Sequence, residues 1–343
     1  MPGSAVSDLA GRVLAGRYLL HGAIGTGASG RVYVAEDTRL RRQVAVKVLH
    51  AALAEDTAFL RRFRAEAQLA ASLHHPHIVT VHDWGEDDVP FMVLELLEGG
   101  SLRSMLDQGN LLTIAQAARV GRDVASALDY AHARGILHRD IKPANLLFDE
   151  HGIVRVADFG LARALAEASW TEPAGAVFGT ARYASPEQAR GTQLDARSDL
   201  YSLGLVLVEA VTGRVPFTAD TTLGTLTART LRPLTAPDAL GPLAPVIDRA
   251  GTIEPGDRYP DAATMRQAIA DAAEALPPPG PLLLAGMIDR ADPHPTRAVP
   301  DRTAPLFDQD AIEVLAPVAA PEALLVEPEA PAGSGGGPAT RRR

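Results

Sequence analysis

The stretch His138-Arg139-Asp140-Ile141-Lys142-Pro143-Ala144-Asn145, followed shortly by Asp158-Phe159-Gly160, decides how this chain is interpreted. Within one predicted loop–strand–loop segment it supplies a candidate base (Asp140), an ammonium (Lys142) and two oxygen ligands for a magnesium ion (Asn145 and Asp158). These groups suit phosphoryl transfer, in which a protein mainly positions the reactants and neutralises phosphate charge. A site of this kind also needs phosphate-binding groups, and the upstream sequence offers candidates.

The first candidate is the glycine-rich stretch Gly25-Thr26-Gly27-Ala28-Ser29-Gly30, which matches the pattern G-x-G-x-x-G. Residues 31–37 follow it with strand-like alternation and no helical period. The loop is therefore predicted between two strands, which excludes a dinucleotide-binding domain and is typical of a loop that covers ATP phosphates. Taken alone, the motif is equally compatible with a plain glycine-rich β-turn.

The second candidate is Lys47, which ends the run Val44-Ala45-Val46-Lys47. Strand alternation places Ala45 and Lys47 on one face. In a predicted helix at 57–73, Glu66 lies on the apolar side, where a carboxylate is costly unless it is paired. We predict that Glu66 pairs with Lys47. The alternatives are a solvent-facing lysine and a Glu66 that reaches water from the edge of the apolar stripe.

Together and in this order, the motifs resemble the catalytic core of the bacterial Hanks-type (eukaryotic-like) Ser/Thr protein kinases over residues 17–275. The resemblance implies an α+β, bilobal protein-kinase-like fold with a small β-rich N-lobe at 16–97 and a larger, mostly helical C-lobe at 98–275. An N-terminal extension precedes it at 1–15. Half of the 26 prolines, 13, fall in 276–343, which predicts a mostly disordered tail.

Sequence patterns predict the strands and helices of these two lobes. The strands are expected at 18–20, 31–35, 44–49, 78–83 and 91–95, the helices at 57–73, 113–134 and 198–212, and a hairpin at 145–157.

The resemblance assigns roles to the motif residues. Asp140 accepts or orients the substrate hydroxyl proton, Lys142 neutralises the γ-phosphoryl group, and the Lys47–Glu66 pair orients the ATP phosphates. Asn145 and Asp158 hold Mg²⁺, with Mn²⁺ as a substitute. Leu94 falls at the gatekeeper position. The implied nucleotide site consists of Ile24, Gly25, Gly27, Gly30, Val32, Ala45, Lys47, Leu147, Asp158 and the backbone of Glu95 and Leu97.

Other residues match structural positions of the family. His138 is expected to be buried rather than to act as an acid or base. Asp199, inside an apolar helix, needs hydrogen-bond partners and is expected to brace the catalytic loop. Glu187 is expected to pair with Arg258, and Thr180 to line the substrate pocket beside Asp140 and Lys142.

Activation is expected to involve a phosphorylated loop, because Arg139 precedes the catalytic aspartate. Between Gly160 and Gly179 the hydroxyl residues are Ser169 and Thr171. We predict that Thr171 is the main autophosphorylation site and that Glu172 partly replaces a phosphate; the alternative is a solvated Glu172 without that role.

Substrate preference departs from the strongly basophilic kinases. Ala144 and Ser101 stand where such kinases carry carboxylates, so a preference for Arg-rich substrates is not expected.

Composition limits the other possibilities. A formal net charge of −9 argues against nucleic-acid binding, and the absence of cysteine excludes disulfides and thiolate chemistry. No signal peptide and no apolar run of membrane-spanning length are evident, so a cytoplasmic location is expected.

The predicted function is transfer of the γ-phosphoryl group of ATP to Ser/Thr hydroxyls of protein substrates, with autophosphorylation and a signalling role. Expected partners are protein substrates, a transient homodimer, and phosphothreonine-binding readers of a tail containing Thr296, Thr303 and Thr340. The alternatives are a pseudokinase scaffold, which ordinarily lacks one of the catalytic residues, and a small-molecule phosphotransferase of related fold.

Overall fold

The computed structural model describes residues 9–27, 30–50, 57–159, 182–219 and 221–286, without the side chains of residues 57–59, 62 and 66. All of these residues belong to one compact unit, Met1–Leu306.

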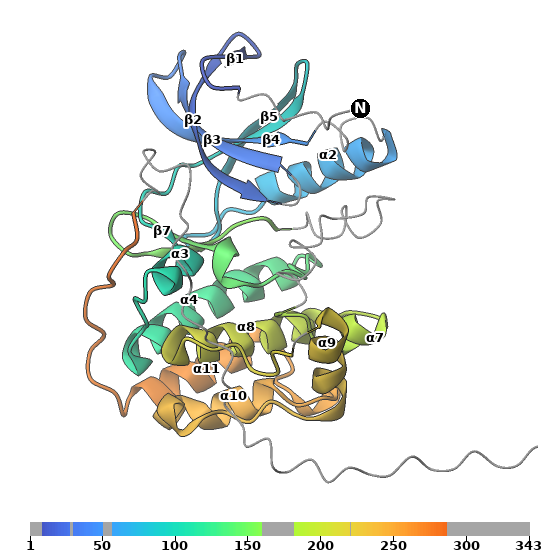
Figure 1. The fold of residues 1–343 in the computed structure, drawn as a ribbon, viewed down its shortest axis with the longest axis vertical. Coiled ribbons are helices and arrows are strands. Elements are labelled where there is room, and N and C mark those ends of the chain that lie inside the picture. The colour runs from blue at the N-terminus through green and yellow to red at the C-terminus, as the bar shows by residue number, and fades with distance from the viewer. Residues whose placement is uncertain (1–8, 28–29, 51–56, 160–181, 220, 287–343) are drawn as a thin grey trace, which may run out of the picture. The chain divides into compact units, whose positions relative to one another are not determined.

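The described residues of the N-lobe form an antiparallel sheet and the helix α2 (Thr57–Ala71) (Figure 1). The strand order is β1-β2-β3-β4-β6-β5, and the bounds are β1 Val13–Leu14, β2 Tyr18–Gly27, β3 Gly30–Asp37, β4 Arg42–Leu49, β5 Val81–Glu86 and β6 Pro90–Leu94. Alternation along β4 sends Val44, Val46 and Val48 to one apolar cluster of the sheet. Leu49 joins Phe63, Ala67 and Met92 in a separate cluster, through which α2 packs on the sheet.

The glycine-rich stretch connects β2 to β3, with Gly27 opposite Gly30 in the ladder. Gly30 has no room for a side chain, because a Cβ atom there would lie 2.1 Å from the carbonyl oxygen of Val48 in β4. The prediction of a glycine loop between two strands is confirmed.

The strand predicted at 78–83 is wrong in its bounds, because its residues pair with two different partners. Ile78 forms a parallel bridge with Val156, and the Val79 N–H donates to the Val156 carbonyl at 3.0 Å. β5 begins only at Val81 and continues to Glu86 along β6. Ile78 and Val79 therefore pair with β9 (Val154–Val156) of the C-lobe, and only the residues from Val81 onward pair within the N-lobe sheet.

The C-lobe is built around α8 (Ala196–Thr212), in which 13 of the 17 residues are buried. The other helices are α3 Leu102–Asp107, α4 Ile114–His132, α7 Pro186–Arg190, α9 Thr222–Leu231, α10 Ala244–Ala250 and α11 Ala262–Ala273. The helix predicted at 113–134 is α4, which begins after the N-cap Thr113 with a capping box to Gln116. α8 ends at Gly213, whose φ of 73° stops the helix.

A small sheet of β7 (Gly100–Ser101), β8 (Leu146–Phe148) and β9 (Val154–Val156) lies in the C-lobe next to α3. The β8–β9 pair is the predicted hairpin. β8 follows the 3₁₀ turn Pro143–Asn145, so this sheet anchors both ends of the segment that carries Asn145 and Asp158.

The chain remains ordered beyond the boundary at 276. Residues 277–286 run along the C-lobe after α11, and Leu282 and Leu284 pack partly buried against its core. Figure 1 shows this orange segment rising beside the helices toward β7. The packed part of the chain therefore includes residues beyond 276.

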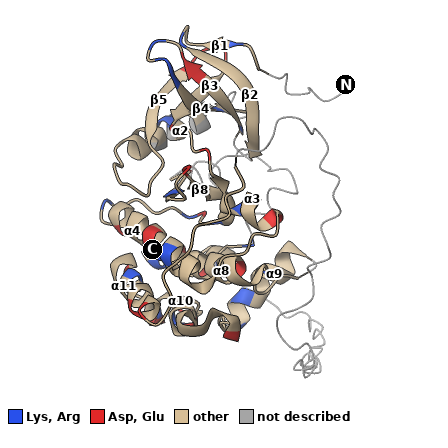
Figure 2. Ribbon diagram, turned by 90° about the vertical axis from the view of Figure 1, so that its left-hand side faces the viewer, with Lys and Arg blue, Asp and Glu red and all other residues tan. Residues whose placement is uncertain are grey.

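Basic and acidic residues are interspersed over strands and helices alike in Figure 2. Among the described residues, none of the helices combines the length and apolar character required to span a membrane.

Candidate active site

The first feature of the site is a contact between β4 and the segment after β9. The Nζ atom of Lys47 lies 2.8 Å from both carboxylate oxygens of Asp158. Lys47 is 6% exposed at its side chain and Asp158 is 31% exposed. Desolvation acts to raise the pKa of Asp158, but the charge and hydrogen bonds of Lys47 outweigh it and hold this pKa below its ordinary value.

The second feature is the catalytic-loop cluster. Lys142 Nζ lies 2.7 Å from Asp140 Oδ2, and Asn145 Nδ2 donates to the Asp140 carbonyl at 2.8 Å and to Oδ2 at 3.2 Å. Lys142 precedes the 3₁₀ turn Pro143–Asn145 and Asn145 ends it, and both side chains contact the same oxygen, Oδ2 of Asp140. The structure thus brings together Asp140, Lys142 and Asn145, as the sequence predicted.

The buried carboxylate of Asp199 in α8 accepts hydrogen bonds from the backbone of the catalytic loop. Asp199, 1% exposed, accepts from the backbone N–H groups of His138 and Arg139 at 2.9 and 2.7 Å and contacts His132 Nε2 at 2.8 Å. Burial acts to raise its pKa, but the His132 hydrogen bond and the other contacts hold it below the ordinary value. Arg139 has a positive φ of 67°, a backbone conformation that these two N–H bonds stabilise. The predicted bracing role of Asp199 is confirmed in its geometry.

His138 is fully buried, as predicted. Its Nε2 lies 2.8 Å from the Ala157 carbonyl, and its ring meets Phe159 edge-on with 4.7 Å between centroids. The imidazole therefore joins the catalytic loop to the Asp158–Phe159 segment.

The predicted pair of Glu187 and Arg258 is present. The guanidinium donates to both carboxylate oxygens of Glu187 at 2.8 and 2.9 Å, and Ser198 Oγ donates to Glu187 Oε1 at 2.6 Å. The pair links α7 to the chain after the 3₁₀ turn Pro255–Asp257, and the Ser198 bond links α7 to the first turn of α8. Nearby, the buried Arg229 of α9 donates to the carbonyls of Arg182 and Ala184, which precede α7.

The segment after β6 contains the predicted adenine-edge residues. The Glu95 N–H donates to the Thr80 carbonyl at 3.0 Å, and its carboxylate accepts from the Thr80 N–H at 2.7 Å and pairs with Arg155 at 3.1 Å. In the described part of the chain, the Leu97 N–H has no hydrogen-bond partner. Glu95 is thus held by its neighbours, two residues before the Leu97 N–H.

The predicted apolar residues of the nucleotide site come from four strands. Ile24 lies on β2, Val32 on β3, Ala45 on β4 and Leu147 on β8. Val32 is opposite Lys47 in the ladder, and Ala45 is opposite Leu94. Ala45 is 7% exposed, whereas Gly25 and Gly27 are exposed.

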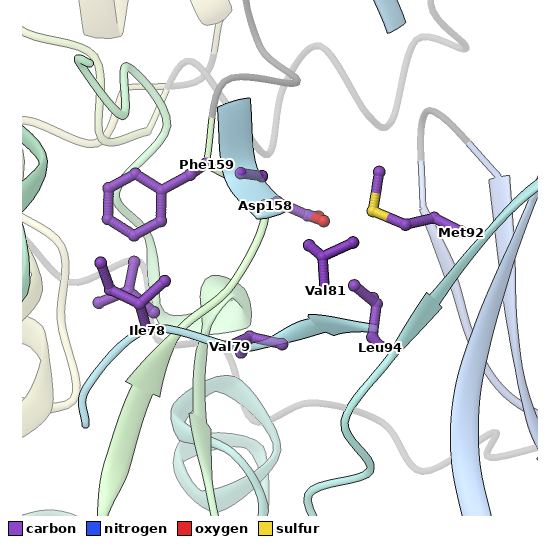
Figure 3. A pocket seen from close by; sticks show the side chains of 9 residues that line it. Ile78, Val79, Val81, Met92, Leu94, Asp158 and Phe159 are labelled. Carbon is purple, nitrogen blue, oxygen red and sulfur yellow. The ribbon is translucent and has the colours of Figure 1, made fainter. Parts of the chain in front are cut away.

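Leu94 is one of the residues that line a small pocket, which Figure 3 shows from close by. Val81, Met92 and Leu94 face the Asp158 carboxylate there, with Phe159, Ile78 and Val79 on the other side. Ala70 of α2 and Val156 of β9 complete the lining. Asp158 is its single charged member, so the pocket is an apolar space adjoining the Lys47–Asp158 pair and does not include the predicted adenine residues.

Some predicted residues lie outside the described part of the chain. These are the side chain of Glu66, whose backbone belongs to α2, and Gly160, Ser169, Thr171, Glu172 and Thr180. Their roles, including the Lys47–Glu66 pair, stay predictions.

Sequence reasoning missed a second buried carboxylate of α8. Glu209, 3% exposed, accepts from the Tyr183 hydroxyl at 2.6 Å and from Arg103 of α3 at 2.7 Å. Burial and the neighbouring Glu209 charge raise the pKa of Tyr183, which stays a donor. The signal was available, since Glu209 lies in the same apolar helix that drew attention to Asp199.

The donor set suits a hard divalent cation. Asp158 offers carboxylate oxygens, and the Asn145 amide donates through Nδ2 to Asp140, which leaves its carbonyl oxygen Oδ1 for a ligand. No group of three or more His, Cys, Asp or Glu in a metal-binding arrangement occurs among the described residues. One carboxylate and one amide would be a small ligand set, and small sets of this kind are typical of magnesium sites completed by phosphate and water.

Lys47 and Asp158 form one cluster of the site, and Asp140, Lys142 and Asn145 of the catalytic loop form the other. These charged and amide groups suit the binding of nucleotide phosphates. The comparisons with known proteins specify the class of protein. Residues 18–236 match the family model described as the protein kinase domain. The chain belongs to this family, in its bacterial Ser/Thr branch, and the predicted resemblance is confirmed.

Two relatives illustrate the similarity. The chain is 44% identical over 277 residues to the probable serine/threonine-protein kinase SCO3848 of Streptomyces coelicolor, covering 78% of this chain and 41% of that protein. It is 43% identical over 283 residues to the serine/threonine-protein kinase PknB of Mycobacterium tuberculosis, covering 79% and 45%. The chain thus matches less than half the length of these relatives.

Among solved structures, the kinase domain of Mycobacterium tuberculosis PknI is 31% identical, with a TM-score of 0.60. The match covers 78% of this chain and 99% of that one. The predicted bilobal fold is confirmed.

Proposed function

We propose that this chain transfers the γ-phosphoryl group of ATP to Ser or Thr hydroxyls of protein substrates. The observation that carries the proposal is that two clusters adjoin: Lys47 with Asp158, and Asp140 with Lys142 and Asn145. The Ala157 N–H, next to Asp158, donates to the Asn145 carbonyl at 2.8 Å and joins them. The family implies ATP and a divalent metal ion, and the donor chemistry favours Mg²⁺, with Mn²⁺ as a substitute.

In the proposed reaction, the substrate hydroxyl oxygen forms a bond to the γ-phosphorus while the bond from that phosphorus to the β–γ bridging oxygen breaks. Asp140 accepts or orients the hydroxyl proton, and ADP leaves. Lys142, 2.7 Å from Asp140, is placed to neutralise the transferring group. Asn145 and Asp158 would hold the metal ion, which would neutralise charge at the phosphates.

Nucleotide recognition is assigned to the other predicted residues. Lys47, oriented by Glu66, contacts the α- and β-phosphates, and Gly25, Gly27 and Gly30 allow backbone to approach them. Ile24, Val32, Ala45 and Leu147 enclose adenine, whose edge meets the backbone of Glu95 and Leu97.

Regulation and partners are part of the proposal. Thr171 is the proposed autophosphorylation site, with Glu172 as a partial substitute, and Arg139 would receive the phosphate. Protein substrates, phosphothreonine readers and a transient homodimer are the proposed partners. Because the phosphate donor is ATP, the site is expected to face the cytoplasm.

The test compares the wild-type chain with Asp140→Asn and with Asp257→Asn as a matched control outside the site. With ATP, MgCl₂ and a Ser/Thr protein substrate, the proposal predicts a rate lowered about 10²- to 10⁴-fold in Asp140→Asn, with nucleotide binding retained. The control should match the wild type. A wild-type chain that binds nucleotide without transferring phosphate would favour a pseudokinase scaffold instead.

A further inference from the structure

The segment 280–286 runs from the end of the C-lobe to the chain that follows β6, and is named here the strap. It begins after α11 and ends beside Gly99, close to the predicted adenine-edge residues (Figure 1). Its side chains alternate: Leu282 and Leu284 pack against the C-lobe core, whereas Leu283 is 68% exposed. This is the pattern of an extended segment with one buried face.

Side-chain amides hold the strap along its length. Gln116 Nε2 donates to the Pro281 carbonyl at 2.7 Å and to the Gly280 carbonyl at 3.3 Å. Asn110 Nδ2 donates to the Leu283 carbonyl at 3.4 Å. Gln116 serves two purposes, since its Oε1 accepts from the Thr113 N–H at 2.9 Å to cap α4. The strap is thus tied to the first turn of α4.

The C-terminal end of the strap and β8 hold Gly99 through its carbonyl and its N–H, an arrangement named here the clamp. Gly286 N–H donates to the Gly99 carbonyl at 3.2 Å, while the Gly99 N–H donates to the Phe148 carbonyl of β8 at 2.9 Å. Neither Gly99 nor Gly100 has room for a side chain at this contact. A Cβ at Gly99 would lie 2.5 Å from the Asp149 carbonyl oxygen, and one at Gly100 would lie 2.5 Å from the Gly286 carbonyl oxygen.

The clamp bears on nucleotide binding because of where Gly99 lies. It follows Glu95 by only a few residues, and Leu97, with its available N–H, lies between them. Glu95 is fixed at the other end through Thr80 and Arg155. The Glu95–Gly99 segment is therefore held at both ends, by Thr80 and Arg155 at Glu95 and by β8 together with the strap at Gly99.

We propose that the strap positions the Glu95–Gly99 backbone for nucleotide binding, with Leu282 and Leu284 as positioning residues that act through Gly99. The inference rests on the proposed assignment of Glu95 and Leu97 to the adenine edge. Loss of the strap contacts lets the segment relax, so that part of the binding free energy is used to order it again.

The experiment uses the full chain, with ATP in excess MgCl₂ and a Ser/Thr peptide substrate. Leu282→Ala/Leu284→Ala is compared with Leu283→Ala, which truncates an exposed leucine of the same segment in the same way. The double variant is expected to raise the KM for ATP about 5-fold, the size of a modest coupling between sites. Its kcat and its KM for the peptide should be unchanged, and Leu283→Ala should match the wild type.

A second variant guards against loss of folding. Gln116→Glu keeps the oxygen that caps α4 but removes the amide donor to the strap, so a smaller increase in the KM for ATP is expected. An unchanged KM for ATP in both variants, or a uniform loss of activity and stability, would overturn the strap's positioning role. Failure of the wild type to bind nucleotide would instead reject the proposed function itself.

Discussion

Two ion pairs join distant parts of this chain with similar geometry and different surroundings. Arg258 uses all its N–H groups: three bonds go to the carbonyls of Thr252, Arg197 and Ile253, and two go to Glu187. Its side chain is 0% exposed and that of Glu187 is 5% exposed. Lys47 and Asp158 are also 2.8 Å apart, but the carboxylate is 31% exposed beside an apolar pocket. The first pair is closed, and the second is open to a ligand.

The comparison separates stability from activity. A closed, fully hydrogen-bonded pair is sensitive to the loss of either partner, because the other charge stays buried without compensation. An open pair costs less to disrupt, since water reaches the remaining group, and its charges remain available for phosphate and metal. The following substitutions test this division.

The largest effect is expected at the open pair. Lys47→Met removes the ammonium that would contact the phosphates, so the phosphotransfer rate should fall about 10³-fold or more. Thermal unfolding should change little, because Asp158 is partly solvated. The phosphotransfer rate and the melting temperature are measured on the same preparation. A Lys47→Met variant with a much lower melting temperature but a nearly unchanged rate would contradict the division.

At the closed pair, Arg258→Met should lower the free energy of unfolding by about 3–5 kcal/mol, as for other buried pairs that lose one partner. Urea denaturation of the wild type and the variant measures this difference. A variant with wild-type stability would show that the closed pair does not support the C-lobe.

A third pair adds a pH dependence in the N-lobe. Two hydrogen bonds from Arg17 hold the pKa of the buried Asp37 at about 2, below its ordinary value of 3.8. Because the folded pKa is the lower one, the stabilisation is complete above pH 3.8 and is lost as the pH falls through about 2.

Asp37→Asn should therefore lower the melting temperature by several degrees near neutral pH, and the difference should shrink in acid. Melting curves at several pH values test this, with Asp88→Asn at an exposed ion pair as the control. A difference that does not depend on pH would contradict the assignment.

The smallest effect is expected at the surface. Arg190 pairs with Glu254 at 3.3 Å, with side chains 38% and 65% exposed. Arg190→Met should change the free energy of unfolding by about 1 kcal/mol or less. The same urea titration serves as the comparison for Arg258→Met; equal losses in the two variants would show that burial does not separate the pairs.

Sequence patterns predicted the main strands and helices of the two lobes, because these elements depend on local order. The glycine loop and the β8–β9 hairpin follow from alternation and turn residues, and a carboxylate in an apolar helix indicated that Asp199 needs hydrogen-bond partners. The roles of the catalytic residues and the position of Asp199 under the catalytic loop were implied by the resemblance to the kinase family, and the catalytic roles stay predictions. The strand at 78–83 was misplaced because the apolar run Ile78-Val79 pairs with β9, a partner that periodicity does not reveal.

The strap shows a different limit. The run from Pro281 to Ile288 is apolar but too short to span a membrane, and its sequence indicates no partner within the chain. Its three leucines follow a proline-rich stretch whose composition favours disorder. Docking depends on Gln116 and Gly99, which lie far away in the sequence; Gln116 is 165 residues from Pro281. No local pattern contains that information.

The most direct test of the account uses a property of the composition. The chain contains two lysines, Lys47 and Lys142, and both belong to the proposed site. An ATP derivative with an acyl group on its terminal phosphate transfers that group to an amine held near the phosphates, and mass spectrometry locates it. We predict acylation at Lys47, Lys142 or both, suppressed by excess ATP with MgCl₂. Labelling confined to the N-terminal amine, or unaffected by ATP, would contradict the account.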